Sequence, residues 1–331
     1  MEKREFVGID VSKLTLDVCL FSKKSHSQFQ NNDKGFKKLT KWIEKATSKR
    51  ISELAFCFEH TGLYSLPLSI YLEQNKVSFY VVSGLLVKRS LGLKRGKSDR
   101  IDAFDLARFV YLHQAELKQY TLPSQNIIKL KQLLSFRTRL IRQRGAYLAN
   151  VKETKLLLGY DNKDLIISTS VELIRVLSEN IKVIEHEMMQ YIKVDEDINI
   201  TYKNLTTIKG VGMIVAIALI TSTNNFQSFD NWRQFACYAG IAPFEHQSGT
   251  SYRGKTRIST LGNRHLKTLL SQAAASSIQF NPEMKIYYQR RVSEGKNKMS
   301  TLNIIRNKIV SRMFAIAKRQ TPYVDTYKFA A

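Results

Sequence analysis

The chain has 331 residues, of which 44% are hydrophobic, so it can bury a substantial core and is not a mainly disordered protein. Its 52 lysines and arginines exceed its 28 acids and give a net charge of +24. A charge of this size favours nucleic acid or another anionic surface as the partner, and the length suggests two or three domains.

The sequence pattern disfavours membrane and secreted proteins. The longest apolar run, residues 211–220, is much shorter than the roughly 20 residues that a membrane-spanning helix needs. The charged segment 1–5 does not resemble a secretory signal. Cys19, Cys57 and Cys237 are far apart and lie in apolar contexts, so we predict that they are reduced core residues of a cytoplasmic protein.

The first stretch, residues 1–115, is predicted to form a mixed α/β domain. Short apolar or alternating segments predict strands, and segments with apolar residues three or four positions apart predict helices. The predicted strands are 6–10, 14–21, 27–30, 54–58 and 77–82, and the predicted helices are 34–47, 66–72 and 99–112. A hairpin or meander followed by alternating helices and strands predicts a mixed sheet with flanking helices.

The second stretch, residues 116–198, has an almost entirely helical pattern. Apolar residues recur at steps near 3.5 residues, which predicts a helical hairpin or a dimerising coiled coil. The seam residues are Ile127, Leu130, Leu134, Ile141, Leu148 and Val151, then Ile174, Leu177, Ile181, Ile184, Met188 and Tyr191, with Arg137 and Arg144 at two seam positions. No acid occurs between Leu117 and Lys152, so we expect the basic face of this segment to meet phosphate.

The third stretch, residues 199–331, is predicted to be mainly helical and is again basic. Segment 205–216 matches a helix-hairpin-helix pattern, in which Gly210 and Gly212 would let backbone N–H groups approach a DNA phosphate. An ordinary turn between packed helices would produce the same pattern. Ser248 lies in a polar segment before several cations, where composition alone favours a plain loop over a nucleophile.

Four acids stand out because they occupy strand ends or a helix start in a basic chain. Asp10 and Glu59 end predicted strands, and Asp99 and Asp102 lie three positions apart, which places both on one helix face. A buried carboxylate is costly unless it is paired or bound to a metal. Four converging carboxylates would hold two Mg²⁺ or Mn²⁺ ions about 4 Å apart, the arrangement that phosphoryl transfer uses.

Each of these acids also has a purely structural explanation. Asp10 could cap the following turn, and Glu59 could pair with a lysine. Asp99 could be a helix N-cap, and Asp102 could be a first-turn acid favoured by the helix dipole. Asp105 continues the same helical spacing and competes with Asp102 as a ligand. The prediction of a metal site therefore rests on the set and its order rather than on any single residue.

The motifs taken together are similar to those of a known family. Segments 7–13 (VGIDVSK), 59–62 (EHTG) and 97–103 (KSDRIDA) resemble the acidic motifs of DEDD transposases of the IS110 type, which are related to the Piv invertases. Ser98 stands where this family often has threonine. Segments 239–249 and 261–266 resemble the C-terminal transposase domain of the same family, and the resemblance covers nearly the whole chain.

The resemblance implies a RuvC-like, RNase H-type fold for residues 1–115. It implies that Asp10, Glu59, Asp99 and Asp102 hold the metal ions and that Ser248 attacks a DNA phosphate to form a phosphoserine link. Ser251 is a nearby alternative hydroxyl. The resemblance also implies a homodimer or tetramer joined through the coiled coil, donor and target DNA as substrates, a noncoding bridge RNA as guide, and a prokaryotic, nucleoid-associated setting.

We therefore predict an insertion-sequence transposase or recombinase. The predicted nucleic-acid contacts are Lys94, Arg95, Lys97, Arg137, Arg139, Arg142, Arg144, Gly210, Gly212, Arg253, Lys255, Arg257 and Arg264. Two other functions fit parts of the same pattern. A RuvC-type junction endonuclease would use the four acids with water as the nucleophile. A non-catalytic nucleic-acid-binding protein would carry the acids for structural reasons and would show only salt-dependent binding.

Overall fold

The computed structural model describes residues 5–92, 96, 98–248 and 252–325. The chain divides into two compact units, Met1–Leu122 and Pro123–Ala331. Among the described residues, no helix combines the length and apolar character needed to cross a membrane.

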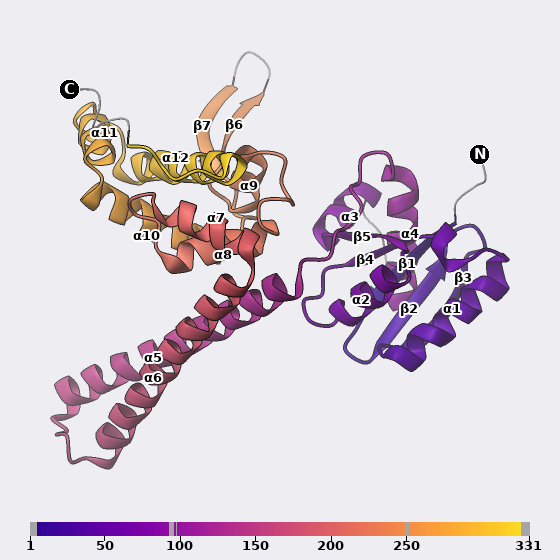
Figure 1. Ribbon diagram of the computed structural model, residues 1–331, viewed down its shortest axis with the longest axis horizontal. Helices are drawn as coiled ribbons and strands as arrows, with labels where there is room; N and C mark the ends of the chain where they lie inside the picture. Colours follow the sequence, from indigo (N-terminus) through magenta and orange to yellow (C-terminus); the bar gives the residue numbers. More distant parts are fainter. Residues whose placement is uncertain (1–4, 93–95, 97, 249–251, 326–331) are drawn as a thin grey trace. The chain divides into compact units, whose positions relative to one another are not determined.

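The first unit is built on a five-stranded mixed sheet (Figure 1). In spatial order its strands are β3 (Ser25–Gln30), β2 (Thr15–Leu20), β1 (Phe6–Val11), β4 (Ala55–Glu59) and β5 (Ser78–Val82). Strands β1, β4 and β5 are parallel, whereas β2 pairs antiparallel with both β1 and β3. This arrangement confirms the predicted mixed α/β sheet.

Side chains alternate between the two faces of this sheet. Val7 and Ile9 of β1 join a buried cluster that includes α1 (Asp33–Thr47), η1 (Ile51–Glu53) and α2 (Leu66–Gln74). Phe6 of β1 and Cys57 of β4 join a second cluster with α3 (Gly84–Leu91) and α4 (Asp99–His113). Helices therefore cover both faces, as predicted, although the sequence pattern did not predict α3.

Helix α4 lies very close to β1 at Gly8. A Cβ atom added to Gly8 would overlap the carbonyl oxygen of Ala103 and the backbone nitrogen of Ala107, so only glycine permits this approach. Further along the helix, the ring of Tyr111 meets the ring of Phe6 edge-on, with 5.6 Å between centroids. Helix α4 therefore runs antiparallel to β1, and its first turn lies toward the end of β1 that carries Asp10.

The second unit begins with a long helical hairpin formed by α5 (Gln125–Leu158) and α6 (Leu165–Val194) (Figure 1). The hairpin was one of the two predicted arrangements. Its buried seam contains Leu130 and Leu134 of α5 and Ile184 and Met188 of α6. Leu148 was predicted to lie in the seam, but it is 49% exposed, because the buried cluster with α8 reaches only the first part of α5.

The rest of the unit is mainly helical, as predicted. It contains α7 (Glu196–Thr206), α8 (Met213–Thr223), α9 (Trp232–Tyr238), β6 (Pro243–Ser248), β7 (Tyr252–Ile258), α10 (Arg264–Phe280), α11 (Pro282–Ser293) and α12 (Lys298–Arg319). The apolar run 211–220 supplies most of α8, which is a buried core helix. Two expectations were wrong. The segment around Ser248 is a β-hairpin rather than a plain loop, and Cys237 is exposed rather than part of the core.

Candidate active site

Asp10 and Glu59 lie beside each other at the same end of two parallel strands. The β1–β4 ladder pairs Phe6 with Ala55 and continues to Ile9 with Phe58. One further step in this register places Asp10 beside Glu59. Side chains at matched positions of neighbouring strands point to the same face. Both carboxylates therefore belong to the face of the sheet that α4 covers.

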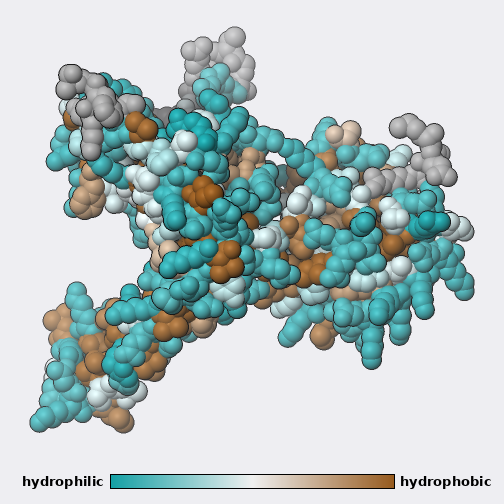
Figure 2. Space-filling model, in the orientation of Figure 1, coloured by the Kyte–Doolittle hydropathy of each residue, from teal (hydrophilic) through white to brown (hydrophobic). Residues whose placement is uncertain are grey.

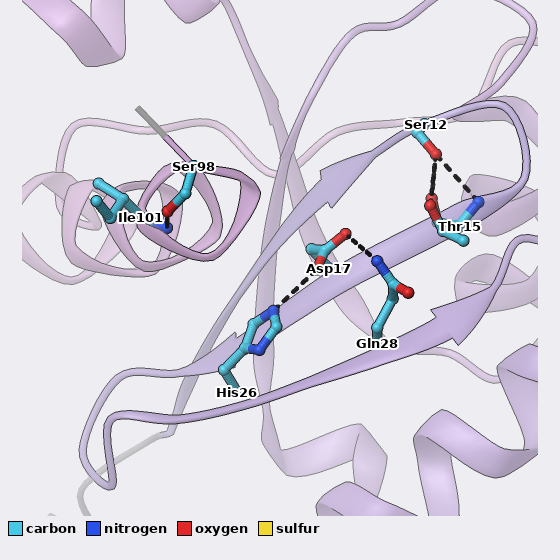
Figure 3. A network of polar contacts seen from close by, with 7 residues as sticks. All are labelled: Ser12, Thr15, Asp17, His26, Gln28, Ser98 and Ile101. Atoms are coloured by element: carbon cyan, nitrogen blue, oxygen red, sulfur yellow. Dashed lines mark hydrogen bonds and ion pairs between the residues drawn. The ribbon is translucent and has the colours of Figure 1, made fainter. Parts of the chain in front are cut away.

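Asp99 and Asp102 lie in the first turn of α4, whose start is fixed by Ser98. The Ser98 side-chain oxygen accepts a hydrogen bond from the backbone N–H of Ile101 at 3.3 Å (Figure 3). Ser98 is therefore the N-cap, and the alternative in which Asp99 caps the helix does not hold. Because α4 crosses β1 at Gly8 in the antiparallel direction, its first turn is carried toward Asp10.

The turn after β1 does not need Asp10 as a cap. Ser12 forms this turn itself, because its side-chain oxygen accepts a hydrogen bond from the backbone N–H of Thr15 at 3.0 Å (Figure 3). The Ser12 and Thr15 hydroxyls are also 2.7 Å apart. Ser12 therefore caps this turn, and Asp10 is not needed as a turn cap.

The electrostatics of Asp10 show that the predicted acids gather around it. The pKa of Asp10 is raised from its ordinary 3.8 to about 6, mainly by burial and then by the charges of Asp99, Asp102, Glu59 and Asp17, in that order of size. Like charges have this effect only when they lie within interaction range of each other. The structure thus places Asp99, Asp102 and Glu59 within electrostatic range of Asp10.

Asp17 is a fifth acid at this site, which sequence analysis missed. It stands directly opposite Asp10 in the β1–β2 ladder and is only 6% exposed. Its carboxylate accepts a hydrogen bond from Gln28 Nε2 at 3.0 Å and lies 2.9 Å from His26 Nε2 (Figure 3). The available signal was a single acid between the apolar residues of a strand that is buried on both faces.

Glu59 is positioned by a glycine on α3. A Cβ atom added to Gly84, the first residue of α3, would overlap both carboxylate oxygens of Glu59. The carboxylate therefore occupies space that any other residue at position 84 would fill. This contact fixes where the Glu59 side chain can lie, and the sequence pattern gave no indication of it.

The donor set suits a hard divalent cation, because Asp10, Glu59, Asp99 and Asp102 offer only carboxylate oxygens. Within the described residues, no group of three or more histidine, cysteine, aspartate or glutamate side chains is arranged so that it could hold a metal ion. The structure thus gathers the negative charges at one place without arranging them as a formed metal site.

Ser248 ends β6 in the second unit, where it pairs with Tyr252 of β7. The side chains of Ser248, Arg253 and Lys255 lie outside the described part of the structure, as do Lys94, Arg95, Lys97 and Ser251 in full. Arg257 and Arg264 are described and exposed.

The four predicted arginine contacts on α5 fall into two pairs. Arg139 and Arg142 are exposed. Arg137 instead forms an ion pair with Glu185 of α6 at 2.6 Å, and Arg144 donates a hydrogen bond to the Ser178 hydroxyl at 3.3 Å. These two arginines lie at seam positions, so the facing helix engages them.

The two glycines before α8 differ in their surroundings. Gly210 has a φ of +99°, and a Cβ there would lie 2.7 Å from the carbonyl oxygen of Ala273 on α10. Its role in a close helix contact matches the ordinary-turn alternative. Gly212 is the N-cap of α8, and an added Cβ would meet nothing within 4 Å. A side chain at this position would therefore be tolerated.

Two family models match the chain. A DEDD transposase model of the IS110 type matches residues 7–159, and the model described as "Transposase IS116/IS110/IS902 family" matches residues 202–289. The pilin gene-inverting proteins of Moraxella bovis and Moraxella lacunata are each 29% identical to this chain, over 97% of its length and 98% of theirs. The transposase for insertion sequence element IS1111A of Coxiella burnetii is 24% identical over 70% of this chain and 69% of its own. The chain therefore belongs to the IS110 family of transposases and is a DNA recombinase enzyme.

Proposed function

We propose that this transposase cuts and rejoins insertion-sequence DNA through a serine-linked intermediate, with divalent metal held by Asp10, Glu59, Asp99 and Asp102. The observation that carries the proposal is the setting of Asp10, where burial and then the like charges around it raise its pKa to about 6. Clustered carboxylates with perturbed pKa values are typical of functional sites that receive cations. The mixed sheet that supports them is consistent with a RuvC-like fold for this unit.

Bound Mg²⁺ or Mn²⁺ would supply Lewis-acid polarisation of the scissile phosphate and would neutralise developing negative charge. The four acids would hold the metal, and Gly84 would keep the Glu59 carboxylate in place. His26 and Gln28 would hold the Asp17 side chain in place on the strand next to Asp10.

The covalent step would use the hydroxyl of Ser248. Its oxygen would attack the phosphorus, so that a serine–phosphate bond forms while the bond from phosphorus to the 3′ oxygen breaks. The serine proton would pass to solvent, and the departing 3′ oxygen would take up a proton. Attack by a 3′-hydroxyl of another strand would then restore a phosphodiester and release the serine. Each step replaces one phosphate ester bond by another, so no ATP is consumed.

The basic surface supports a nucleic-acid partner beyond the DNA that is cut. The chain carries a net charge of +24, and Arg139 and Arg142 are exposed on a segment without acids. We propose that a noncoding bridge RNA occupies part of this surface and directs the protein to donor and target DNA. Removal of RNA from the protein should then abolish recombination while leaving sequence-independent DNA binding intact.

The end of the α5–α6 hairpin supports a homodimer, which could in turn pair to form a tetramer. Leu156, Leu157 and Leu165 are 77%, 76% and 79% exposed, and Figure 2 shows apolar residues gathered at this end. Contiguous exposed apolar side chains of this kind mark interaction surfaces. Replacement of Leu156 and Leu157 by serine should convert the dimer to a monomer in light-scattering measurements, and an unchanged mass would exclude this surface.

The test of the central proposal uses a plasmid that carries the gene with its native flanks. It is incubated with purified protein, RNA from the expressing cell and Mg²⁺, and denaturant-resistant protein–DNA adducts are measured for the wild type and for Ser248→Ala. An adduct that the substitution removes supports the serine intermediate, whereas Ser251→Ala should retain it. Nicking without an adduct, unchanged in Ser248→Ala, would instead favour the water-using endonuclease. Adducts that persist in both variants would exclude both serines.

A further inference from the structure

A small polar cavity lies at the base of the β6–β7 hairpin, at the end opposite Ser248. Its volume is about 140 Å³. Its lining residues are Gly240, Ser259, Thr260, Gly262, Arg264 and Lys267. Gly240 lies shortly before β6, and Ser259 directly follows β7, so the cavity and Ser248 belong to the same hairpin.

The cavity is framed by two loops that cross at a pair of glycines. A Cβ atom added to Gly240 would lie 2.8 Å from the Cα of Gly262, and one added to Gly262 would overlap Gly240. The crossing is secured by Asn263, whose backbone N–H donates to the carbonyl oxygen of Tyr238 at 2.9 Å. The Asn263 side chain also accepts a hydrogen bond from the backbone N–H of Leu266 at 3.1 Å and so caps α10. The cavity wall is therefore fixed by the fold.

Two cations of this wall have no counter-ion in the described structure. Arg264 and Lys267 lie on one face of α10, because they are three residues apart. Among the described residues, no ion pair and no side-chain hydrogen bond involves either of them. The three described acids that follow Ser248 are each paired elsewhere: Glu283 with Arg312 at 2.7 Å, Glu294 with Arg291 at 2.5 Å, and Asp325 with Lys209 at 3.2 Å.

The remaining lining groups are donors that suit an anion. The Ser259 hydroxyl accepts a hydrogen bond from the backbone N–H of Leu261 at 3.1 Å, which leaves its own proton free to donate. Thr260 adds a second hydroxyl. A guanidinium, an ammonium and hydroxyl groups around one cavity are the chemistry that proteins use to bind phosphate.

We propose that this cavity holds a phosphodiester of the DNA strand that Ser248 cuts, at a position several nucleotides from the cut. This proposal rests on the proposed function. Strand β6 has six residues, so at about 3.4 Å per residue its two ends are about 17 Å apart. Phosphates along one strand rise about 3.4 Å per step along the helix axis and also wind around it, so a straight span of about 17 Å places the anchored phosphate about three steps from the scissile one. The cavity thus sets the register of the cut.

The test measures the salt dependence of DNA binding in EDTA, with a fluorescent 20-base-pair duplex of arbitrary sequence. Loss of one phosphate contact lowers the slope of log Kd against log[KCl] by about 1. Arg264→Ala and Lys267→Ala should each lower the slope by up to about 1, and the double variant should also lower it by about 1, because both cations hold one phosphate. Arg264→Lys should retain most of the slope.

The matched control is Lys318→Ala with Arg319→Ala, two exposed cations at the end of α12. The Lys318→Ala and Arg319→Ala substitutions should change the slope of log Kd against log[KCl] additively or not at all. An additive loss of about 2 in the Arg264/Lys267 double variant would overturn the proposal, since it would indicate independent surface charges. No loss, or a loss seen only with a duplex RNA of the same sequence, would also overturn it. Urea unfolding of each variant verifies that it is folded.

These measurements need neither metal nor cleavage, so Ser248→Ala protein should give the same slopes. If no serine adduct forms but the Arg264/Lys267 double variant still lowers the slope non-additively, the proposed cleavage chemistry is refuted. The proposal of a phosphate in the cavity would then still hold. When the adduct maps the cut, a methylphosphonate about three steps away should weaken wild-type binding and leave Arg264→Ala binding unchanged. If the methylphosphonate weakens wild-type and Arg264→Ala binding equally, the proposed spacing between the cavity and the cut is refuted.

Discussion

Replacement of Asp10 by asparagine should stabilise the metal-free protein while it abolishes cleavage. The pKa of Asp10 is about 6 in the folded protein and 3.8 ordinarily, so folding favours the protonated form. One pKa unit corresponds to about 1.4 kcal/mol, and the full difference would be about 3 kcal/mol. Because Asp10 is only half-buried and solvent screens its neighbours, we expect about 1 to 2 kcal/mol.

The sign of this effect gives it a characteristic pH dependence. Between pH 4 and pH 6, as an approximate window, the folded state holds a proton that the unfolded state has lost. The stability of the wild type therefore falls as the pH rises through this window, whereas the variant does not lose this contribution. The two proteins should be equally stable near pH 3.5 and differ fully above about pH 7.

The assay is urea unfolding in EDTA, followed by tryptophan fluorescence. The chain has two tryptophans, and Trp42 lies in the first unit against Phe29. A Trp232→Phe background therefore lets Trp42 report on the unit that contains Asp10. Glu44→Gln, an exposed acid on α1, is the matched control. If Asp10→Asn is no more stable than Glu44→Gln at pH 7.5, burial and the neighbouring acids do not disfavour the ionised form of Asp10 as the structure indicates.

Addition of Mg²⁺ should reverse this order. A ligand present at 100 times its Kd stabilises the folded state by about 2.7 kcal/mol, so the wild type should gain stability and Asp10→Asn should not. Equal gains in both proteins would exclude Asp10 as a ligand. DNA binding by Asp10→Asn should stay close to that of the wild type, because phosphate contacts come from the basic surface.

Four further predictions concern the site and the hairpin. Gly8→Ala should lower stability by about 1 to 3 kcal/mol, because its Cβ would displace α4; a urea midpoint equal to that of the wild type would refute the close approach. Gly84→Ala should lower Mg²⁺-dependent cleavage at least tenfold without weakening DNA binding, because its Cβ would displace the carboxylate of Glu59. Mg²⁺ binding should weaken below about pH 6, since Asp10 must lose its proton to bind metal. The binding is measured as the increase in unfolding free energy that Mg²⁺ gives. Arg137→Ala should destabilise the hairpin by about 1 to 2 kcal/mol, because it leaves Glu185 partly buried without its partner.

Two substitutions provide controls for these predictions. Gly145 lies within α5, and a Cβ there would meet nothing within 4 Å, so Gly145→Ala should be neutral or stabilising by up to about 1 kcal/mol. Arg142→Ala removes an exposed arginine from the same helix and should change stability by less than about 0.5 kcal/mol. A loss of stability in Arg142→Ala equal to that in Arg137→Ala would show that the Glu185 ion pair is not responsible.

The sequence determined much of the local structure. Alternating and helical spacing of apolar residues predicted the five strands of the sheet, the helices α1, α2 and α4 and the helical character of residues 125–194, because these patterns reflect which side of an element is buried. It also identified four acids whose placement at strand ends and a helix start is unusual in a basic chain. The family resemblance rested on these residues.

Only the tertiary structure decided how these residues meet. The ladder register places Asp10 beside Glu59, and the absence of a side chain at Gly8 lets α4 carry Asp99 and Asp102 toward them. Such contacts join segments distant in sequence, so no local pattern specifies them. The space that Gly84 leaves for Glu59 and the engagement of Arg137 by Glu185 have the same origin. Composition and spacing thus identified candidate site residues, whereas strand register and close helix packing determined which of them lie close to one another.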